Sequence, residues 1–218
     1  MILGIYGAGG LGREVYEVAH TINCQSLSWS EIIFIDDGDD IKDIRKIPIY
    51  TFKQASRRFS QEPFEVCIAV GEPSVRQILY DKLVAEGIKI ATLVHPEVSI
   101  PDSTMIGEGT IICKFVSITC DIRIGNNVYI HPMACIGHDS VIGDSSVISS
   151  FVDVAGDCNI GEKVFLAIGV VMRQGISVGN KSIVGMSSVI HRDIPESVIA
   201  MGNPARAMKH NEKERVFK

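Results

Sequence analysis

The sequence predicts an α/β N-terminal domain of half-Rossmann type, followed by an all-β domain built as a parallel β-helix. The first observation is a six-residue repeat: from Val94 to Ile190, every sixth residue is Val, Ile, Leu or Met, as in hexapeptide β-helices. The second is a glycine-rich turn, GAGGLG at 7–12, between a strand pattern and a helix pattern. We expect an α/β domain at 1–93, a β-helix at 94–195 and a C-terminal tail at 196–218.

Composition and charge exclude several classes of protein. The chain has 21 basic and 26 acidic residues, a formal net charge of −5, and neither half is a basic patch, so no nucleic-acid partner is expected. The sequence has no run of 18 apolar residues and no secretory signal pattern, which predicts a cytoplasmic protein without membrane insertion. Its six cysteines form no CxxC motif, which indicates reduced thiols.

The N-terminal elements are predicted in the order β-α-β-α-β. Residues 2–6 (ILGIY) and 32–37 (IIFIDD) have the composition of buried strands, and residues 65–71 (EVCIAVG) form a third. Helical spacing follows the glycine-rich turn, and residues 73–87 have a proline near the start and a glycine at the end, as helices do. A glycine-rich turn at a helix N-terminus is a natural anion site.

The glycine-rich turn is only a weak signal for NAD. A dinucleotide domain needs two mononucleotide halves and roughly 150 residues, whereas the repeat here begins at Val94. A nucleotide carried on a sugar fits one half-fold better. Asp36 and Asp37 follow the second strand, where they either contact that nucleotide or are solvated turn residues.

A longer period lies on top of the six-residue repeat. The corner motifs IGEG, IGNN, IGDS, IGEK and VGNK begin at 106, 124, 142, 160 and 178. Their spacing of 18 residues equals three hexads, so each coil has three faces and the domain has five to six triangular coils. Residues 18 apart become neighbours on adjacent coils, about 4.8 Å apart.

One histidine leaves this regular pattern at the rim of a coil. His138 stands in a column with Asp102, Cys120, Gly156 and Gln174, and Gly156 leaves space beside it. An imidazole with a reference pKa near 6.5 suits a general base at neutral pH, and a neighbouring carboxylate, Asp139, can orient it. This position therefore predicts an imidazole that faces a ligand.

Other interpretations of this column remain open. His138 could be an ordinary surface residue, or could form a nucleophilic pair with Cys120. A zinc site from Cys113, Cys120 and His138 lacks recognisable ligand spacing. His95 and His131 each precede a proline, and we expect both to serve corner structure, with His131 the next candidate base.

Several segments resemble one known family. GAGGLGRE, IDD, AVGEP, LVHP, CIGHDSVIG and GNPAR are similar to bacterial sugar acetyltransferases, the sialic-acid O-acetyltransferases and the bacillosamine-pathway UDP-sugar N-acetyltransferases. The resemblance covers nearly the whole chain. It implies left-handed β-helices assembled as a homotrimer, with acetyl-CoA held between neighbouring prisms and no metal.

The resemblance also assigns roles to residues. It implies that His138 is the general base and that Asp139 is the acidic neighbour that tunes the basicity of His138. The motif match implies that the sugar nucleotide contacts Gly9, Gly10, Leu11, Asp36, Asp37 and Gly71. It implies that acetyl-CoA contacts Gly156, Ile168 and Gly185. Some relatives have a second histidine just after the catalytic coil, whereas this chain has Ser146 and Val147, so that contact is not carried over.

The expected function is therefore acetyl transfer from acetyl-CoA to a sugar in surface-glycan biosynthesis. We expect the acceptor to be the amino group of a nucleotide-linked amino sugar. One alternative is O-acetylation of sialic acid or a related sugar hydroxyl, and another is a non-catalytic binding scaffold. Apolar or small residues at outward positions agree with the homotrimer: Ala134, Cys135, Phe151, Ala155 and Ala167.

Overall fold

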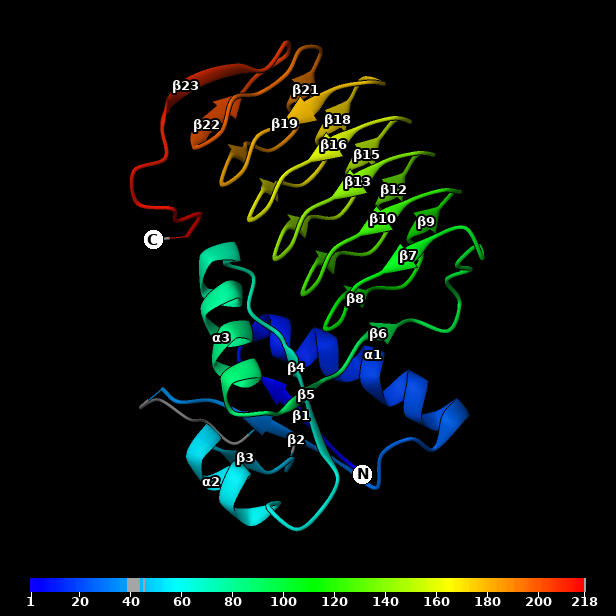
Figure 1. Ribbon diagram of the computed structural model, residues 1–218, viewed down its shortest axis with the longest axis vertical. Helices are drawn as coiled ribbons and strands as arrows, with labels where there is room; N and C mark the ends of the chain where they lie inside the picture. The colour runs from blue at the N-terminus through cyan, green and yellow to red at the C-terminus, as the bar shows by residue number, and fades with distance from the viewer. Residues whose placement is uncertain (39–43, 45, 218) are drawn as a thin grey trace.

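The computed structural model describes residues 1–38, 44 and 46–217, and it consists of an α/β part and a β-helix (Figure 1). The α/β part is a parallel sheet with strand order β3-β2-β1-β4-β5. Its strands are β1 (Ile2–Tyr6), β2 (Glu31–Ile35), β3 (Ile49–Tyr50), β4 (Phe64–Ile68) and β5 (Lys89–Ile90). Its helices are α1 (Gly10–Ser26), α2 (Phe52–Arg58) and α3 (Pro73–Ala85).

The predicted elements are present, with three additions and shifts of a few residues at the ends of β2, β4 and α3. Strands β3 and β5 and helix α2 were not predicted, because two-residue strands and a seven-residue helix are too short to show a period. Helix α2 begins instead with a local signal, a capping box between Thr51 and Gln54. Strand β4 ends at Ile68, so residues 69–71 form a loop at the carboxyl edge of the sheet.

The two faces of the sheet are covered differently. Helices α2 and α3 cover one face, where Phe52, Phe59 and Leu83 join its core. Helix α1 and the first coils of the β-helix share the other face, where Val15 and Tyr129 belong to one cluster. The β-helix is therefore packed against the α/β part through an apolar interface.

A buried arginine connects the two parts. Arg76 of α3 is fully buried. Its guanidinium donates to the carbonyls of Ile68 and Val70 at 2.7 and 3.1 Å. It also donates to the carbonyl and side-chain oxygens of Asn127 in the β-helix at 2.7 to 2.9 Å. These bonds satisfy buried carbonyls of both parts, which fixes one part relative to the other.

The hexapeptide repeat forms the three faces of a left-handed parallel β-helix. One face contains β7 (Met105–Ile106), β10 (Arg123–Ile124), β13 (Val141–Ile142), β16 (Asn159–Ile160) and β19 (Ser177–Val178). The second contains β6 (Leu93–Val94), β8 (Ile111–Ile112), β11 (Tyr129–Ile130), β14 (Val147–Ile148), β17 (Phe165–Leu166), β20 (Ile183–Val184), β22 (Val198–Met201) and β23 (Arg206–His210). The third contains β9 (Ser117–Ile118), β12 (Cys135–Ile136), β15 (Asp153–Val154), β18 (Val171–Met172) and β21 (Val189–Ile190). Partner residues on adjacent coils are 18 apart, as predicted.

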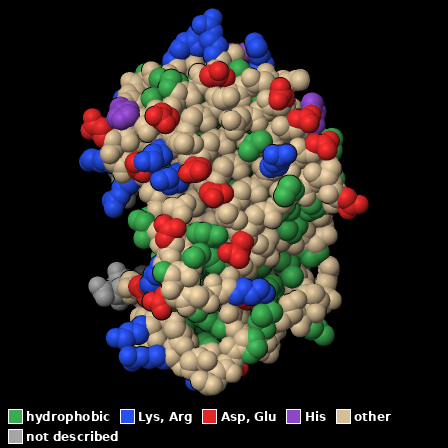
Figure 2. All heavy atoms as spheres, in the orientation of Figure 1, with side chains coloured by type: hydrophobic (Ala, Val, Ile, Leu, Met, Phe, Trp, Pro, Cys, Tyr) green, Lys and Arg blue, Asp and Glu red, His purple; other side chains and the backbone are tan. Residues whose placement is uncertain are grey.

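The outward positions differ in part from the expectation. Ala134 and Ala167 are 1% and 8% exposed, so they face inward or are covered. Phe151 is 59% exposed, as expected, and Phe115 and Met133 precede it in the same column with similar exposure. Figure 2 shows hydrophobic side chains gathered along one side of the β-helix. Phe115, Met133 and Phe151 form what we call the apolar ridge.

After β23 the chain turns back from the far end of the β-helix toward the N-terminus of α3 (Figure 1). None of the helices in the described ranges is both long and apolar enough to cross a bilayer.

Candidate active site

The imidazole of His138 lies in the turn after β12, directly against the next coil. Strand β12 pairs with β15 so that Ile136 faces Val154, and this register places Gly156 beside His138. A Cβ atom added to Gly156 would lie 2.4 Å from both Cε1 and Nε2 of His138, so any side chain there would force the ring to move. We expected open space beside Gly156. Instead, the imidazole ring of His138 fills that space.

Asp139 holds the ring from the other side. Its carboxylate lies 2.7 Å from Nδ1 of His138, while both side chains remain about half exposed, at 51% and 61%. The turn itself is held by backbone bonds, in which Asp139 donates to Cys120 and the carbonyl of His138 accepts from Asp157. A neutral imidazole that donates from Nδ1 keeps its lone pair on Nε2, which can then accept a proton.

The thiol of Cys120 is poorly suited to form a nucleophilic pair with His138. A hydrogen bond to Asp121, with smaller contributions from burial and from the charges of Asp121 and Asp139, raises the pKa of the Cys120 thiol. A raised pKa disfavours the thiolate, which is the nucleophilic form. Within the described residues, no three His, Cys, Asp or Glu side chains are grouped to hold a metal, and all six cysteines are free.

The two histidines before prolines are corner residues. His95 is buried and its Nδ1 accepts from the backbone of Glu97 at 3.2 Å. His131 lies 4.4 Å from Tyr129, edge to face. Burial, followed by the charge of Arg76, lowers the pKa of His131 to about 4. His131 is therefore neutral at pH 7 but a much weaker base than an ordinary histidine.

The glycines of the first turn separate into two kinds. A Cβ on Gly12 would lie 1.9 Å from the carbonyl oxygen of Gly7, and Gly7 has φ +116°, so both are required by strand–helix packing. Gly9 has no atom within 4 Å of a built Cβ, and Gly10 has only the end of Arg13 at 3.9 Å. Gly9 and Gly10 therefore leave the N-terminus of α1 open to a ligand.

The two aspartates after β2 have internal partners. Asp36 accepts from the backbone N–H groups of Ala8 and Gly38, both at 2.9 Å, and so holds the glycine-rich turn. Asp37 accepts from Tyr6, Lys82 and the backbone of Phe52. Although partial burial acts in the opposite direction, these bonds hold the pKa of Asp37 below its ordinary value. Both carboxylates shape the edge of the sheet.

An apolar pocket of about 590 Å³ lies between the two parts of the chain. It brings together four residues that were predicted for two different ligands, Leu11 and Gly71 with Ile168 and Gly185. Gly156, the third residue predicted for acetyl-CoA, lies on another corner with His138. Ser146 and Val147 are fully buried in the β-helix and take no part.

The pocket also contains residues that the sequence reasoning missed. Phe165, Val216 and Phe217 line it, and Phe217 packs edge to face on Phe165 with ring centroids 5.7 Å apart. The segment after Arg206 has no repeat and no motif. Only the apolar pair Val216 and Phe217 in a charged stretch could have indicated a buried contact.

Comparisons with known proteins agree with this division of the chain. Residues 3–83 match the PglD N-terminal domain, and residues 121–156 match the bacterial transferase hexapeptide family (six repeats). The GDP-perosamine N-acetyltransferase of Escherichia coli O157:H7 is 29% identical over 219 residues, which cover 96% of this chain and 97% of the relative. The chain is homologous to sugar acetyltransferases that include this GDP-perosamine N-acetyltransferase.

Solved structures of homologues have the same architecture. PerB from Caulobacter crescentus, in complex with CoA and GDP-perosamine, has a TM-score of 0.87 at 26% identity, covering 96% of this chain and 98% of that one. The acetyltransferase domain of PglB from Neisseria gonorrhoeae FA1090, in complex with acetyl coenzyme A, has a TM-score of 0.87 at 27% identity, covering 95% and 98%. The family resemblance seen in the sequence is therefore confirmed.

Proposed function

We propose that this sugar acetyltransferase homologue transfers the acetyl group of acetyl-CoA to the amine of a nucleotide-linked amino sugar. The observation that carries the proposal is full-length similarity to N-acetyltransferases, combined with an oriented imidazole, His138, at a coil rim. The named activity of these relatives favours the amine over the sugar hydroxyl. A scaffold would need neither the open glycine turn nor the His138–Asp139 pair.

His138 has the geometry that the reaction requires. The acceptor amine attacks the thioester carbonyl carbon and loses a proton to Nε2 of His138. The tetrahedral intermediate then collapses as the C–S bond breaks, and the departing CoA sulfur takes the proton from the imidazolium. Asp139 orients the ring and stabilises its charged form, so the pair returns to its starting state. General base catalysis of this kind contributes roughly 10²- to 10⁴-fold.

The N-terminal part supplies the site for the sugar nucleotide. We assign the phosphates to the open N-terminus of α1 at Gly9 and Gly10, where free backbone N–H groups and the helix dipole favour anions. Asp36 contributes by holding the turn through Ala8. Asp37 contributes by fixing the start of α2, and Leu11 and Gly71 form the side of the site nearest the β-helix.

The complete site requires neighbouring copies of the chain. Ile168 and Gly185 follow strands of the second face, whereas His138 and Gly156 follow strands of the third. One acetyl-CoA that contacts both groups is accommodated where the corner of one copy meets the corner of the next. The apolar ridge supports a homotrimer, because an exposed column of Phe115, Met133 and Phe151 is a typical contact surface.

We also place the protein in the cytoplasm, where acetyl-CoA and reduced thiols are found. An N-acetylated sugar nucleotide is an activated donor for glycosyl transfer, so we assign the reaction to surface-glycan biosynthesis.

The test is a mass-spectrometric screen of acetyl-CoA consumption against GDP-, UDP-, dTDP- and CMP-linked sugars, with and without a free amine. GDP-perosamine is the first compound to test, because it is the substrate named for the relatives. We expect one amino sugar to gain an acetyl group and its hydroxyl counterpart to be inert. Acetylation of the hydroxyl compounds alone would favour an O-acetyltransferase, and binding without any turnover would favour a scaffold.

A further inference from the structure

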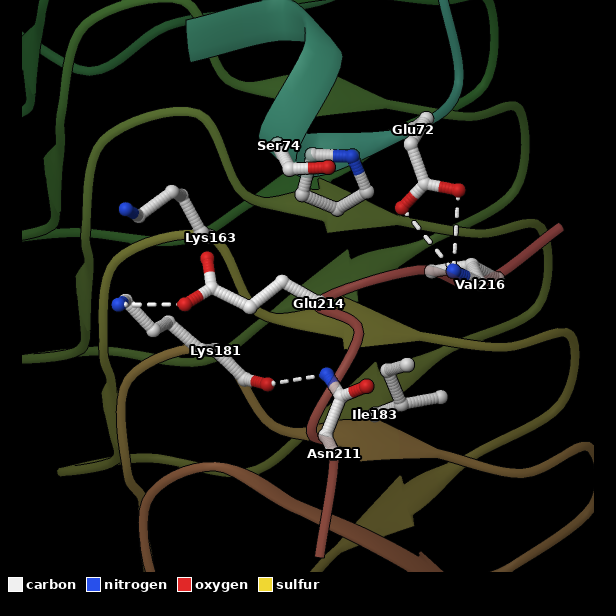
Figure 3. Close-up of a pocket in the computed structure, with 9 residues that line it drawn as sticks. Glu72, Ser74, Lys163, Lys181, Ile183, Asn211, Glu214 and Val216 are labelled. Carbon is white, nitrogen blue, oxygen red and sulfur yellow. Dashed lines mark hydrogen bonds and ion pairs between the residues drawn. The ribbon is translucent and has the colours of Figure 1, made fainter.

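Residues 211–217, which we call the C-terminal strap, run from the β-helix to the N-terminus of α3 (Figure 3). The strap is attached to the β-helix at two points. The side chain of Asn211 donates to the carbonyl of Lys181 at 2.8 Å, and Glu214 pairs with the ammonium of Lys181 at 2.6 Å. The strap therefore leaves the β-helix in a defined direction.

The other end of the strap is held by a single carboxylate. Glu72, which is 8% exposed, accepts the backbone N–H of Val216 at 3.0 and 2.9 Å and that of Phe217 at 3.0 Å. Figure 3 shows this carboxylate pointing at the strap. Hydrogen bonds to an ionised, buried acceptor are among the stronger ones in proteins. Glu72 thus holds the end of the strap through its hydrogen bonds to Val216 and Phe217.

This attachment determines where Phe217 lies. Its ring is packed against Phe165 and would lie 3.5 Å from a Cβ on Gly71. Phe217 therefore lines the pocket beside Gly71 and Phe165, in the same cavity as Ile168 and Gly185. More than half of its side chain is still exposed, so a ligand in the pocket can reach it.

We propose that Glu72 is a positioning residue for the acyl donor: it holds the strap so that Phe217 forms a wall of the pocket that takes the pantetheine arm of acetyl-CoA. This inference rests on the proposed function. The pantetheine arm is a mainly aliphatic chain with two amides. The pocket matches it with apolar walls and a few polar groups, Ser149, Ser150 and His131. Because Glu72 follows Gly71 directly, the same loop connects the sugar site with the coenzyme site.

The experiment is calorimetric titration of CoA, and separately of the accepted sugar nucleotide, into the full-length protein and its variants. Phe217→Ala should weaken CoA binding about tenfold through lost apolar contact. Glu72→Ala should have a similar effect, because it frees the same wall. The double variant should have the same CoA affinity as whichever single variant binds CoA more weakly. The reason is that both substitutions remove the same contact, that of Phe217 with CoA. Affinity for the sugar nucleotide should change less than affinity for CoA, because Phe217 meets the sugar site only beside Gly71.

Two exposed positions away from the pocket serve as controls, Met208→Ala and Glu62→Ala, and both should bind CoA as the wild type does. Thermal unfolding should show that all variants fold. Unchanged CoA binding in Phe217→Ala would overturn this inference, and so would fully additive losses in the double variant. Either result would leave the proposed function standing. A wild-type protein that does not bind CoA at all would overturn the proposed function as well.

Discussion

The imidazole of His138 rests on the backbone of Gly156, one coil further along the β-helix, at a distance that leaves no room for a side chain. The two residues are 18 apart, the length of one coil, so the repeat itself creates the contact. Asp139 holds Nδ1 while Gly156 supports the face of the ring. The orientation of the proposed base therefore depends on a glycine that performs no chemistry.

Replacing Gly156 with alanine should lower kcat about 10- to 100-fold. The added methyl would displace the ring from its place beside Asp139, and small misplacements of catalytic groups are costly. Stability should change little, because the half-exposed His138 can rotate outward. Steady-state kinetics and thermal unfolding measure both effects. Gln174→Ala, one coil beyond Gly156 in the same column, should retain wild-type kcat, and equal losses in both variants would contradict this role.

Replacing Gly10 with valine should raise KM for the nucleotide sugar and leave the affinity for CoA nearly intact. The open surface at Gly10 would be covered by a branched side chain, which prevents close approach of phosphates to the turn. Gly12→Ala is the contrasting variant, since its Cβ meets the carbonyl of Gly7, and it should lose about 1–3 kcal/mol of stability. If Gly10→Val weakens the binding of the nucleotide sugar and of CoA equally, the two binding sites are not separate.

The stability of the protein should fall as the pH drops from 7 to 5, and His131 should account for about 2 kcal/mol of the loss. Burial holds the pKa of His131 at about 4 in the folded chain against an ordinary 6.5. Between these values the unfolded chain binds a proton that the folded chain excludes, so stability is lost as pH falls. Urea unfolding of His131→Gln at both pH values should show a smaller loss. His191→Gln, at an exposed position, should behave as the wild type.

Replacing Phe151 with aspartate should dissociate the proposed trimer. A charge at the end of the apolar ridge would have to be buried without a partner, which opposes association. Light scattering should report three times the mass of one chain for the wild type and for the control Met208→Asp. For Phe151→Asp it should report the mass of a single chain. A wild-type protein that is already monomeric would refute the trimer, and with it a site shared between copies.

Much of the fold could be predicted from sequence because it repeats. The aliphatic residue at every sixth position and the corner motif at every eighteenth determine strands, faces and register, so the neighbours of His138 were known before the structure. The glycine-rich turn likewise indicated the first strand and α1. Strand β3 and helix α2 escaped prediction because a period cannot appear in so few residues.

The site was predictable only where it depends on the register. Neither the partners of Asp36 and Asp37 nor the flat contact between His138 and Gly156 follows from spacing, since both depend on side-chain directions. The partners of the strap could not be predicted. Glu72 and Val216 are 144 residues apart, and their contact results from the way two separately formed parts pack together.

Turnover by His138→Ala is the most direct test of the account. With a verified amino-sugar acceptor, kcat should fall roughly 10²- to 10⁴-fold while KM for either substrate changes little. The variant should unfold at the wild-type temperature, because the half-exposed imidazole contributes little to the core. His191→Gln, at an exposed position that does not line the pocket and assayed at pH 7 in parallel, should keep kcat within a few-fold of wild type. Wild-type turnover by His138→Ala would show that the base lies elsewhere and would contradict the mechanism.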